Sequence, residues 1–231
     1  MEKEVEGKKK IDEILERMGI DLKVLEEEQI KLRKLLELKD NFKIENVKVV
    51  AGCDNAYFDN KIISAIVVID ENFEILEEKF AVGKAGFPYV PGFLAYRELP
   101  IMLECYKKIE NVPDLFIIDG NGLLHPREFG LASHFGLSVN KPTIGISKNL
   151  ILGEAKDNKI YVGKKILAEQ VATKEGSKPI YVSQGNMISL NTAVDVVKKY
   201  IKQPHKLPEP LFLAHHFADK IREELGRKSE E

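Results

Sequence analysis

Apolar positions in the first forty residues recur at helical spacing. From residue 8 to about residue 38, Ile and Leu return every three or four positions, and Lys and Glu fill most of the places between them. This period is typical of an amphipathic helix, and Gly19-Ile20-Asp21 predicts a break within it. We expect an outer helix packed on the core. A coiled coil is less favoured, because the heptads are too few.

The middle of the chain changes to a pattern typical of strands. Val- and Ile-rich runs separated by short polar turns predict an antiparallel meander. These runs are residues 47–53, 61–69 and 74–82. Helical spacing then alternates with short apolar runs that are typical of buried strands. The expected elements are a helix at 94–109, a strand at 115–118, a helix at 128–136 with Gly136 near its end, and a strand at 142–147.

Weaker strand patterns and two helices complete the chain. The expected elements are strands at 160–166 and 180–183, helices at 190–201 and 210–225, and a disordered tail at 226–231. The order of elements predicts an α/β protein with a mixed sheet and helices on its faces. No linker or repeat interrupts it, so we expect a single domain over residues 1–231, with residues 1–42 as a helical N-terminal extension.

Composition narrows the classes of function only slightly. The 35 basic and 37 acidic residues give a net charge of −2, which neither indicates nor excludes a nucleic-acid partner. Cys53 and Cys105 lie far apart and are typical of small buried residues in a reducing compartment. The charged start lacks a signal-peptide core, and the longest apolar run, residues 62–69, is too short to cross a bilayer. We therefore expect a cytoplasmic protein without membrane contact.

Three carboxylates carry the chemistry of this sequence: Asp54, Glu98 and Asp119. Each Asp follows an apolar strand-like run, and Glu98 follows a turn marked by Pro and Gly. Taken singly, each has an ordinary explanation as a turn, capping or solvated residue. Brought together at strand ends they would repel one another, so we expect a divalent cation among them. A metal held by carboxylates points to phosphate chemistry.

The residues around these acids are chemically varied. They are His125, Arg127, Lys148 and His215. His125 could protonate a leaving oxygen or orient the attacking water, and Lys148 could stabilise charge on a phosphate. A turn histidine and a solvated lysine are equally ordinary explanations. The phosphate-binding loop GxxxxGK[ST], the serine elbow GxSxG and the zinc motif HExxH are absent from the sequence.

A second informative segment precedes Glu98. Pro88 and Pro91 bracket Tyr89 and Val90, which predicts a stiff hairpin tip that presents an aromatic and a β-branched side chain. Such a tip suits a wedge pushed into a base stack, because little side-chain entropy is lost on insertion. The alternative is a tyrosine buried in a proline-stiffened turn.

Several long motifs resemble the endonuclease V family of inosine-directed nucleases. They occur in family order between residues 47 and 221: YVPGFLAYRE, IIDGNGLLHPREFGLASHFG, PTIGISK, IYVSQGNMISL and LPEPLFLAHHFADK. The resemblance implies an RNase H-like fold, a mixed β-sheet flanked by helices. It also implies Mg²⁺-dependent hydrolysis of the second phosphodiester 3′ to a deaminated base, leaving 3′-hydroxyl and 5′-phosphate ends. Mn²⁺ is expected to substitute for Mg²⁺.

The resemblance also assigns roles to individual residues. Those matching the metal site are Asp54, Glu98 and Asp119. Those matching the supporting catalytic residues are His125, Lys148 and His215. Those matching the strand-separating wedge are Pro88, Tyr89, Val90 and Pro91. Those falling where the family builds its base pocket are Leu94, Gly120, Gly122 and Gly145. Phe212 departs from the family, since many members carry a basic residue there.

The substrates implied are DNA containing deaminated bases and inosine-containing RNA, and the sequence does not decide between them. We expect a monomer. Two other functions stay open: a structure-specific nuclease of the same fold acting on branched or flapped DNA, and a non-catalytic reader of modified nucleic acid.

Overall fold

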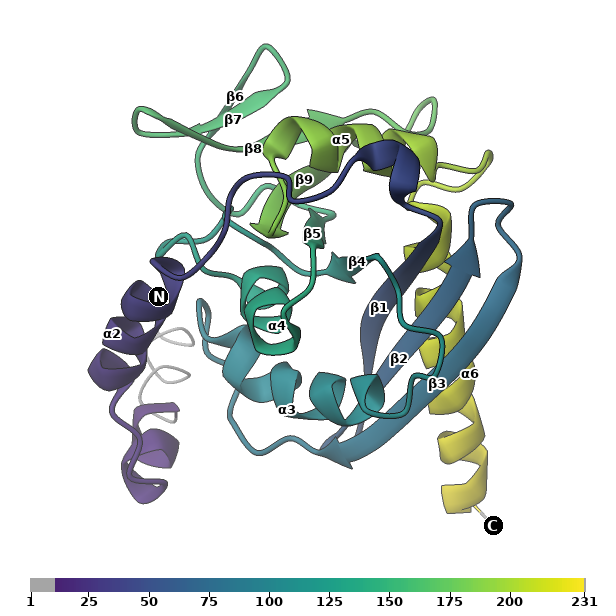
Figure 1. Ribbon diagram of the computed structural model, residues 1–231. Helices are drawn as coiled ribbons and strands as arrows, with labels where there is room; N and C mark the ends of the chain where they lie inside the picture. The colour runs from purple at the N-terminus through teal and green to yellow at the C-terminus, as the bar shows by residue number, and fades with distance from the viewer. Residues whose placement is uncertain (1–10, 231) are drawn as a thin grey trace.

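The structure, a computed structural model, describes residues 11–230. Its centre is a nine-stranded mixed sheet with the order β3-β2-β1-β4-β5-β9-β8-β7-β6, flanked by helices (Figure 1). The strands are β1 (Val49–Phe58), β2 (Lys61–Asp70), β3 (Ile75–Lys84), β4 (Leu115–Asp119), β5 (Thr143–Ser147), β6 (Glu154–Lys156), β7 (Lys159–Val162), β8 (Lys165–Val171) and β9 (Ile180–Asn186). The predicted mixed α/β architecture is confirmed.

The pairing of strands follows the hydrophobic pattern. Strands β1, β2 and β3 form the predicted antiparallel meander. Strand β4 pairs in parallel with both β1 and β5, because α3 and α4 carry the chain back across the sheet. The remaining pairs, from β5–β9 to β7–β6, are antiparallel.

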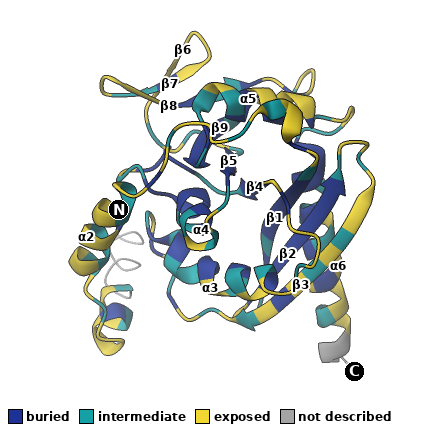
Figure 2. Ribbon diagram, in the orientation of Figure 1, coloured by how far each residue is buried: buried dark blue, intermediate teal, exposed yellow. Residues whose placement is uncertain are grey.

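Helices cover both faces of the sheet. They are α2 (Leu22–Arg33), α3 (Leu94–Tyr106), α4 (Leu131–Val139), α5 (Leu190–Lys199) and α6 (Glu209–Glu230), with a 3₁₀ turn, η1, at Ile44–Asn46. One core cluster joins α5 and the start of α6 to one face of the sheet, and a second joins α3 and α4 to the opposite face. Strands β1 and β2 are buried between these layers, whereas β6 lies exposed at the margin (Figure 2).

The N-terminal segment is helical and broken where the sequence predicts. A first helix spans residues 11–17, and the side chain of Asp21 then caps α2 by accepting from the Lys23 backbone N–H at 2.9 Å. Residues 8–10 of the predicted helix lie outside the described part of the chain. No helix in residues 11–230 is long and apolar enough to cross a membrane.

Three predicted boundaries were wrong. Strand β1 does not end before Asp54; it continues to Phe58, because its later residues pair with β2 along the full register. The single strand predicted at 160–166 is two strands, β7 and β8, and β6 was not predicted. The turn between β7 and β8 contains Gly163 at a positive φ of 60°.

Two helix boundaries also differ from prediction. Helix α4 begins at Leu131 and continues past Gly136 to Val139, where Asn140 ends it in a left-handed conformation with φ 52°. Helix α6 runs to Glu230, through residues expected to form a disordered tail. As far as Leu225 the helix still packs against a core cluster that contains Ile63 of β2 and its own Ile221.

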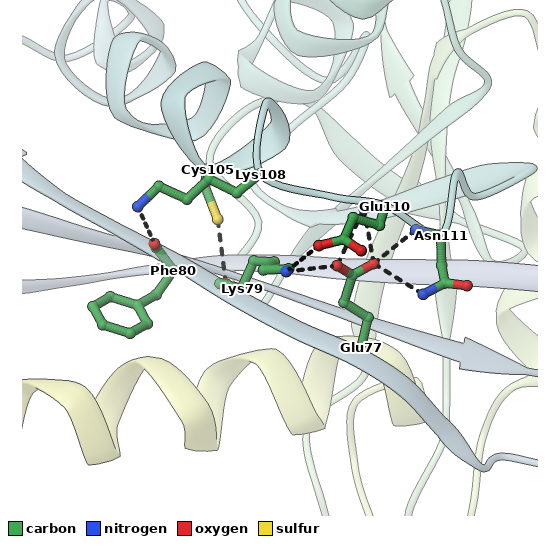
Figure 3. A network of polar contacts seen from close by, with 7 residues as sticks. All are labelled: Glu77, Lys79, Phe80, Cys105, Lys108, Glu110 and Asn111. Atoms are coloured by element: carbon green, nitrogen blue, oxygen red, sulfur yellow. Dashed lines mark hydrogen bonds and ion pairs between the residues drawn. The ribbon is translucent and has the colours of Figure 1, made fainter.

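A polar network fastens the edge strand β3 to the end of α3 (Figure 3). The Glu77 carboxylate accepts hydrogen bonds from the backbone N–H groups of Glu110 and Asn111, at 3.1 and 2.8 Å. Lys79 forms ion pairs of 3.1 Å with both Glu77 and Glu110. These contacts join the exposed edge of the sheet to the loop that leads into β4.

Candidate active site at the end of two parallel strands

The register of β1 against β4 brings two carboxylates together. The parallel ladder ends with Cys53 opposite Ile118, so the next position on each strand is Asp54 and Asp119. Strand alternation turns both side chains to the face that α5 and α6 cover, because Val50 and Ile117 at alternate positions lie in that core cluster. Asp119 ends its strand as predicted, and Asp54 reaches the same place from the middle of β1.

Helix α6 adds a histidine to the pair. Gly52 allows the first turn of α6 to approach β1, since a Cβ at this position would lie 2.0 Å from the backbone oxygen of Pro210. This close approach sets His215 Nδ1 2.6 Å from Asp54 Oδ2. Ligand atoms of Asp54, Asp119 and His215 all lie within 4.8 Å of one another, a spacing that could hold a metal ion.

Glu98 approaches from the other face of the sheet. The residues of β1 on that face, Asn55 and Tyr57, hold its carboxylate: Asn55 Nδ2 donates to Oε2 at 2.9 Å, and the Tyr57 hydroxyl donates to Oε1. Glu98 therefore stays outside the three-residue group, although the sequence placed all three acids in one metal site. Burial, with a smaller contribution from the charges of Asp54 and Asp119, raises its pKa to about 7 against the hydrogen bonds from Tyr57 and Asn55.

The surroundings of Asp119 also disfavour its charged form. Burial raises its pKa to about 6, and the neighbouring Asp54 adds to that rise. Lys148, predicted beside these acids, forms an ion pair of 2.7 Å with Asp119, which lowers the pKa only in part. For Lys148 itself, burial lowers the pKa, but the attraction of Asp119 outweighs it and the pKa is raised.

Three residues around the acids were not predicted. Asn55 and Tyr57 bind Glu98, and Asp219 Oδ2 lies 3.6 Å from His215 Nε2. The signals were present in the sequence: Asn55 and Tyr57 share one side of a strand, and Asp219 follows His215 by one helical turn. The hydrogen bond to Asp54 raises the pKa of His215, against the effect of burial.

The donor set suits a hard divalent cation. Two carboxylates and an imidazole are within reach of one ion, and burial together with the charge of Asp54 disfavours the charged form of Asp119, which a bound cation would stabilise. In addition, the side-chain oxygen of Asn55 is buried without a hydrogen-bond partner beside Glu98. An unpaired buried acceptor next to the acids fits a site in which a bound ion carries water.

His125 does not join the acids. Its Nδ1 accepts from the Arg127 backbone N–H at 3.2 Å, so the ring proton is on Nε2, which lies 3.0 Å from the Gly92 carbonyl oxygen. Burial, and then the charge of Arg127, lower its pKa to about 4. Both ring nitrogens are engaged and the ring is neutral near pH 7. The geometry therefore favours a supporting role over the proton transfer that the sequence suggested.

A cavity of about 400 Å³ lies beside His125. Among the residues lining it are Tyr89, Val90, Pro91, Leu94, Asn121 and Leu131. The segment of Pro88 to Pro91 is a loop without strand pairing rather than the hairpin that was predicted. Its two central side chains also differ: Tyr89 is 63% exposed, whereas Val90 is 8% exposed and packs among residues from the N-terminal helices. Only the tyrosine therefore projects, and the buried-tyrosine alternative was wrong.

The predicted pocket residues divide into two groups. Leu94 lines the cavity, whereas Gly120, Gly122 and Gly145 do not line it. Two of these glycines instead permit close backbone packing beneath it, since a Cβ on Gly145 would lie 2.3 Å from the Gly122 nitrogen. The Gly122 N–H donates to Ser183 Oγ at 2.9 Å, and Asn121, between Gly120 and Gly122, faces the cavity. Phe212 stacks on His205 with ring centroids 3.5 Å apart.

The fold and the site together define a nuclease class. Two carboxylates just beyond the last paired residues of the parallel strands β1 and β4, together with a cavity lined by an exposed aromatic side chain, are suited to phosphodiester chemistry on an extruded base. The family model for endonuclease V matches residues 30–216, and this chain belongs to the endonuclease V family. As a member of that family it is a nuclease with an RNase H-like α/β fold.

Relatives and solved structures agree over most of the chain. An endonuclease V from Thermosipho melanesiensis is 36% identical over 89% of this chain and 95% of its own. One from Dictyoglomus thermophilum is 39% identical over 84% of this chain and 90% of its own. Two crystal structures of endonuclease V align with a TM-score of 0.80 each. The Bacillus subtilis protein is 31% identical over 87% of this chain and 91% of that one. The Ciona intestinalis protein is bound to a 24mer DNA containing an inosine followed by a ribo-adenosine. It is 30% identical over 88% of this chain and 98% of that one.

Proposed function

We propose that this protein hydrolyses nucleic acid beside deaminated bases, chiefly hypoxanthine, at the second phosphodiester 3′ to the lesion. One observation carries the proposal: a single chain holds an acid cluster that could bind a cation and a cavity lined by an exposed aromatic side chain, and two residues of that cavity, Leu94 and Asn121, lie one helical turn from Glu98 and two positions from Asp119. The Ciona intestinalis relative with inosine-containing DNA supports the substrate. The products are 3′-hydroxyl and 5′-phosphate ends, and the cellular role is DNA repair.

The acids would hold a divalent metal, Mg²⁺ or in its place Mn²⁺. Asp54, Asp119 and His215 would bind it directly, and Glu98 would bind it or its water. When bound, such an ion activates water and neutralises charge on the phosphate. Lys148, held by Asp119, lies where it would stabilise the negative charge that grows on the phosphate oxygens.

The cavity would hold the extruded base. Extrusion costs a few kcal/mol and costs least for a mismatched base, so damaged sites are partly self-selecting. Hypoxanthine offers a lactam N–H and C=O where adenine offers an amine and a bare ring nitrogen. Asn121, which lines the cavity between Gly120 and Gly122, would read that difference, and Gly145 allows this segment to pack closely.

Tyr89 would separate the strands. Its ring is exposed at the rim of the cavity, on a loop fixed by Pro88 and Pro91 and by the buried Val90. A rigid aromatic on such a loop can occupy the place of the extruded base. Tyr89→Ala should therefore weaken binding to a lesion duplex without changing thermal stability, measured by gel shift and by thermal unfolding. An equal loss of both would show that the ring is structural.

The proposed substrate is DNA, with inosine-containing RNA as a second. One chain carries both the acid cluster and the cavity, so we propose that a monomer suffices for cleavage. The deciding experiment is strand cleavage of matched inosine-DNA and inosine-RNA oligonucleotides, with and without Mg²⁺, with product ends mapped. We expect metal-dependent incision at the second phosphodiester 3′ to the inosine. Absence of incision on both substrates would overturn the proposal.

The rival function is incision of branched or flapped DNA. The exposed wedge disfavours it, because a flap already presents a single strand and needs no separation. Cleavage of flaps at rates equal to or above those on inosine duplexes would favour this rival.

A further inference from the structure

The carbonyl oxygen of Gly92, directly after the Pro88–Pro91 loop, is the most heavily hydrogen-bonded atom near the cavity. Arg127 Nη2 donates to it at 2.6 Å, and His125 Nε2 donates at 3.0 Å. A third donor comes from far along the chain: Gln29 Nε2, on α2, at 3.2 Å. Three donors on one carbonyl fix the backbone at the base of the wedge.

Gln29 is buried where α2 meets Gly92 and Arg127. It is 1% exposed, lines the cavity, and is engaged at both ends of its amide. While Nε2 donates to Gly92, Oε1 accepts from Arg127 Nε. A buried amide with both ends satisfied has one orientation, and its loss leaves buried partners unpaired. Arg127 also lies over the Phe93 ring, 4.4 Å from its centroid, so the junction is rigid on both sides.

Further contacts hold α2 against the wedge and cavity. Glu26 pairs with Arg127 at 3.3 Å, and the Tyr96 hydroxyl donates to Glu28 at 2.6 Å. Below the wedge, Phe87, Val90 and Phe93 form a core cluster with apolar residues of the two N-terminal helices. Figure 1 shows α2 beside the start of α3, apart from the main layers of the sheet. The first part of the helix is thus attached at the wedge, whereas its last turn packs through Leu32 against a cluster that includes residues of β7 and β8.

From these contacts we infer that α2 is part of the lesion-binding apparatus, and that Gln29 is a positioning residue that sets the wedge loop through Gly92. The inference rests on the proposed function. It gives the N-terminal extension a role, although Gln29 lies just outside the residues that the family model matches. Gln29 touches neither the acids nor, by this account, the scissile phosphate; it acts through the loop that carries Tyr89.

Loss of Gln29 should affect cleavage of duplex and of single-stranded substrates differently. A wedge is needed where a paired strand must be parted, and is unnecessary where the inosine strand is already single. Losing Gln29 should therefore slow cleavage of a duplex far more than cleavage of the same strand alone. A variant that only weakens the fold would slow both equally.

The test compares single-turnover cleavage of an inosine·cytosine duplex and of the lone inosine strand, with Mg²⁺, for the full chain and its Gln29→Met variant. Methionine keeps the volume and removes both hydrogen bonds. We expect the duplex rate to fall by about ten- to a hundredfold, as for a misplaced positioning group, and the single-strand rate to fall by about tenfold less than the duplex rate. Glu77→Ala, which removes the polar network far along the chain on β3, serves as a control for lost stability and should leave the ratio unchanged.

A milder variant keeps the test decisive if Gln29→Met does not fold. Glu26→Ala removes a half-exposed partner of Arg127 and should lower the duplex-to-single-strand ratio by about two- to threefold. An unchanged ratio in both variants, with wild-type protein cutting both substrates, overturns the inference. Failure of the wild-type protein to cut either substrate overturns the proposed function instead.

Discussion

The pKa values of two carboxylates, Glu77 and Glu98, are shifted in opposite directions, although burial raises both. Burial alone would raise the pKa of Glu77, but backbone N–H groups and Lys79 outweigh it and the pKa is lowered. Glu98 also accepts two hydrogen bonds, yet burial and the nearby acids raise its pKa to about 7. Glu77 is satisfied within the fold and stabilises it. Glu98 is held buried beside two other acids, a state typical of functional sites.

The largest expected effect comes from neutralising the acid cluster. Asp119→Asn keeps the shape of the side chain and removes a charge needed to hold a cation. Cleavage of inosine-containing DNA should fall by at least about a hundredfold, measured under single-turnover conditions. Binding of the same DNA, measured by gel shift in EDTA, should survive, because the cavity and wedge are untouched. Loss of binding and cleavage together would indicate that Asp119 is structural, as Glu77 is.

Gly52→Ala tests how the cluster is assembled. The new Cβ would meet the Pro210 backbone, so α6 must move away from β1 and carry His215 from Asp54. We expect a loss of unfolding free energy of about 3 kcal/mol together with a loss of activity. Urea unfolding and cleavage assays on the same preparation measure both. Full activity in a destabilised variant would contradict the assembly described here.

The pH dependence of stability distinguishes Glu98 from Glu77. Without metal, the pKa of Glu98 rises on folding from 4.5 to about 7, so its stabilising protonated form is fully present below pH 4.5 and is lost as pH rises through 7. Wild-type stability should therefore fall over this window by about 2–3 kcal/mol from this group. Glu98→Gln should flatten that fall, as followed by urea unfolding in EDTA. A parallel pH profile in the variant would count against the assignment.

Glu77→Ala has the smallest expected effect, and the contribution of Glu77 to stability depends on pH in the direction opposite to that of Glu98. Because the pKa of Glu77 is lowered on folding, its contribution is present above pH 4.5 and disappears as pH falls below that value. Removing it at pH 7 should cost about 1–2 kcal/mol of unfolding free energy. Cleavage at a temperature where both proteins are folded should be unchanged. A drop in activity would mean that the β3 edge matters to the site.

The hydrophobic period was sufficient for the meander and the later buried strands, because it is a local signal, whereas the convergence of Asp54 with Asp119 was expected from their places at strand ends and from the family resemblance. The sequence pattern placed the end of β1 too early, since Asn55 and Tyr57 are polar residues that look like a turn. They belong to the strand because their partners, β2 on one side and Glu98 on the other, lie elsewhere in the chain.

The same reason explains what was missed at the cavity. Neither the neutral state of His125 nor the burial of Gln29 follows from neighbouring residues. Both depend on Gly92, which lies 33 positions from His125 and 63 from Gln29. A histidine before a proline and a glutamine in a charged helix have ordinary local explanations. Only their tertiary partners separate a positioning role from a solvated one.

The most direct test of the central claim is a calorimetric titration of the metal-free protein with Mn²⁺ at pH 7.5, repeated with Asp119→Asn and with Glu77→Ala. If the buried acids are a cation site, wild-type protein and Glu77→Ala bind the metal with the same saturable affinity, and Asp119→Asn loses most of it. Equal affinity of Asp119→Asn for Mn²⁺ would contradict this, because the metal would then bind without the carboxylate of Asp119.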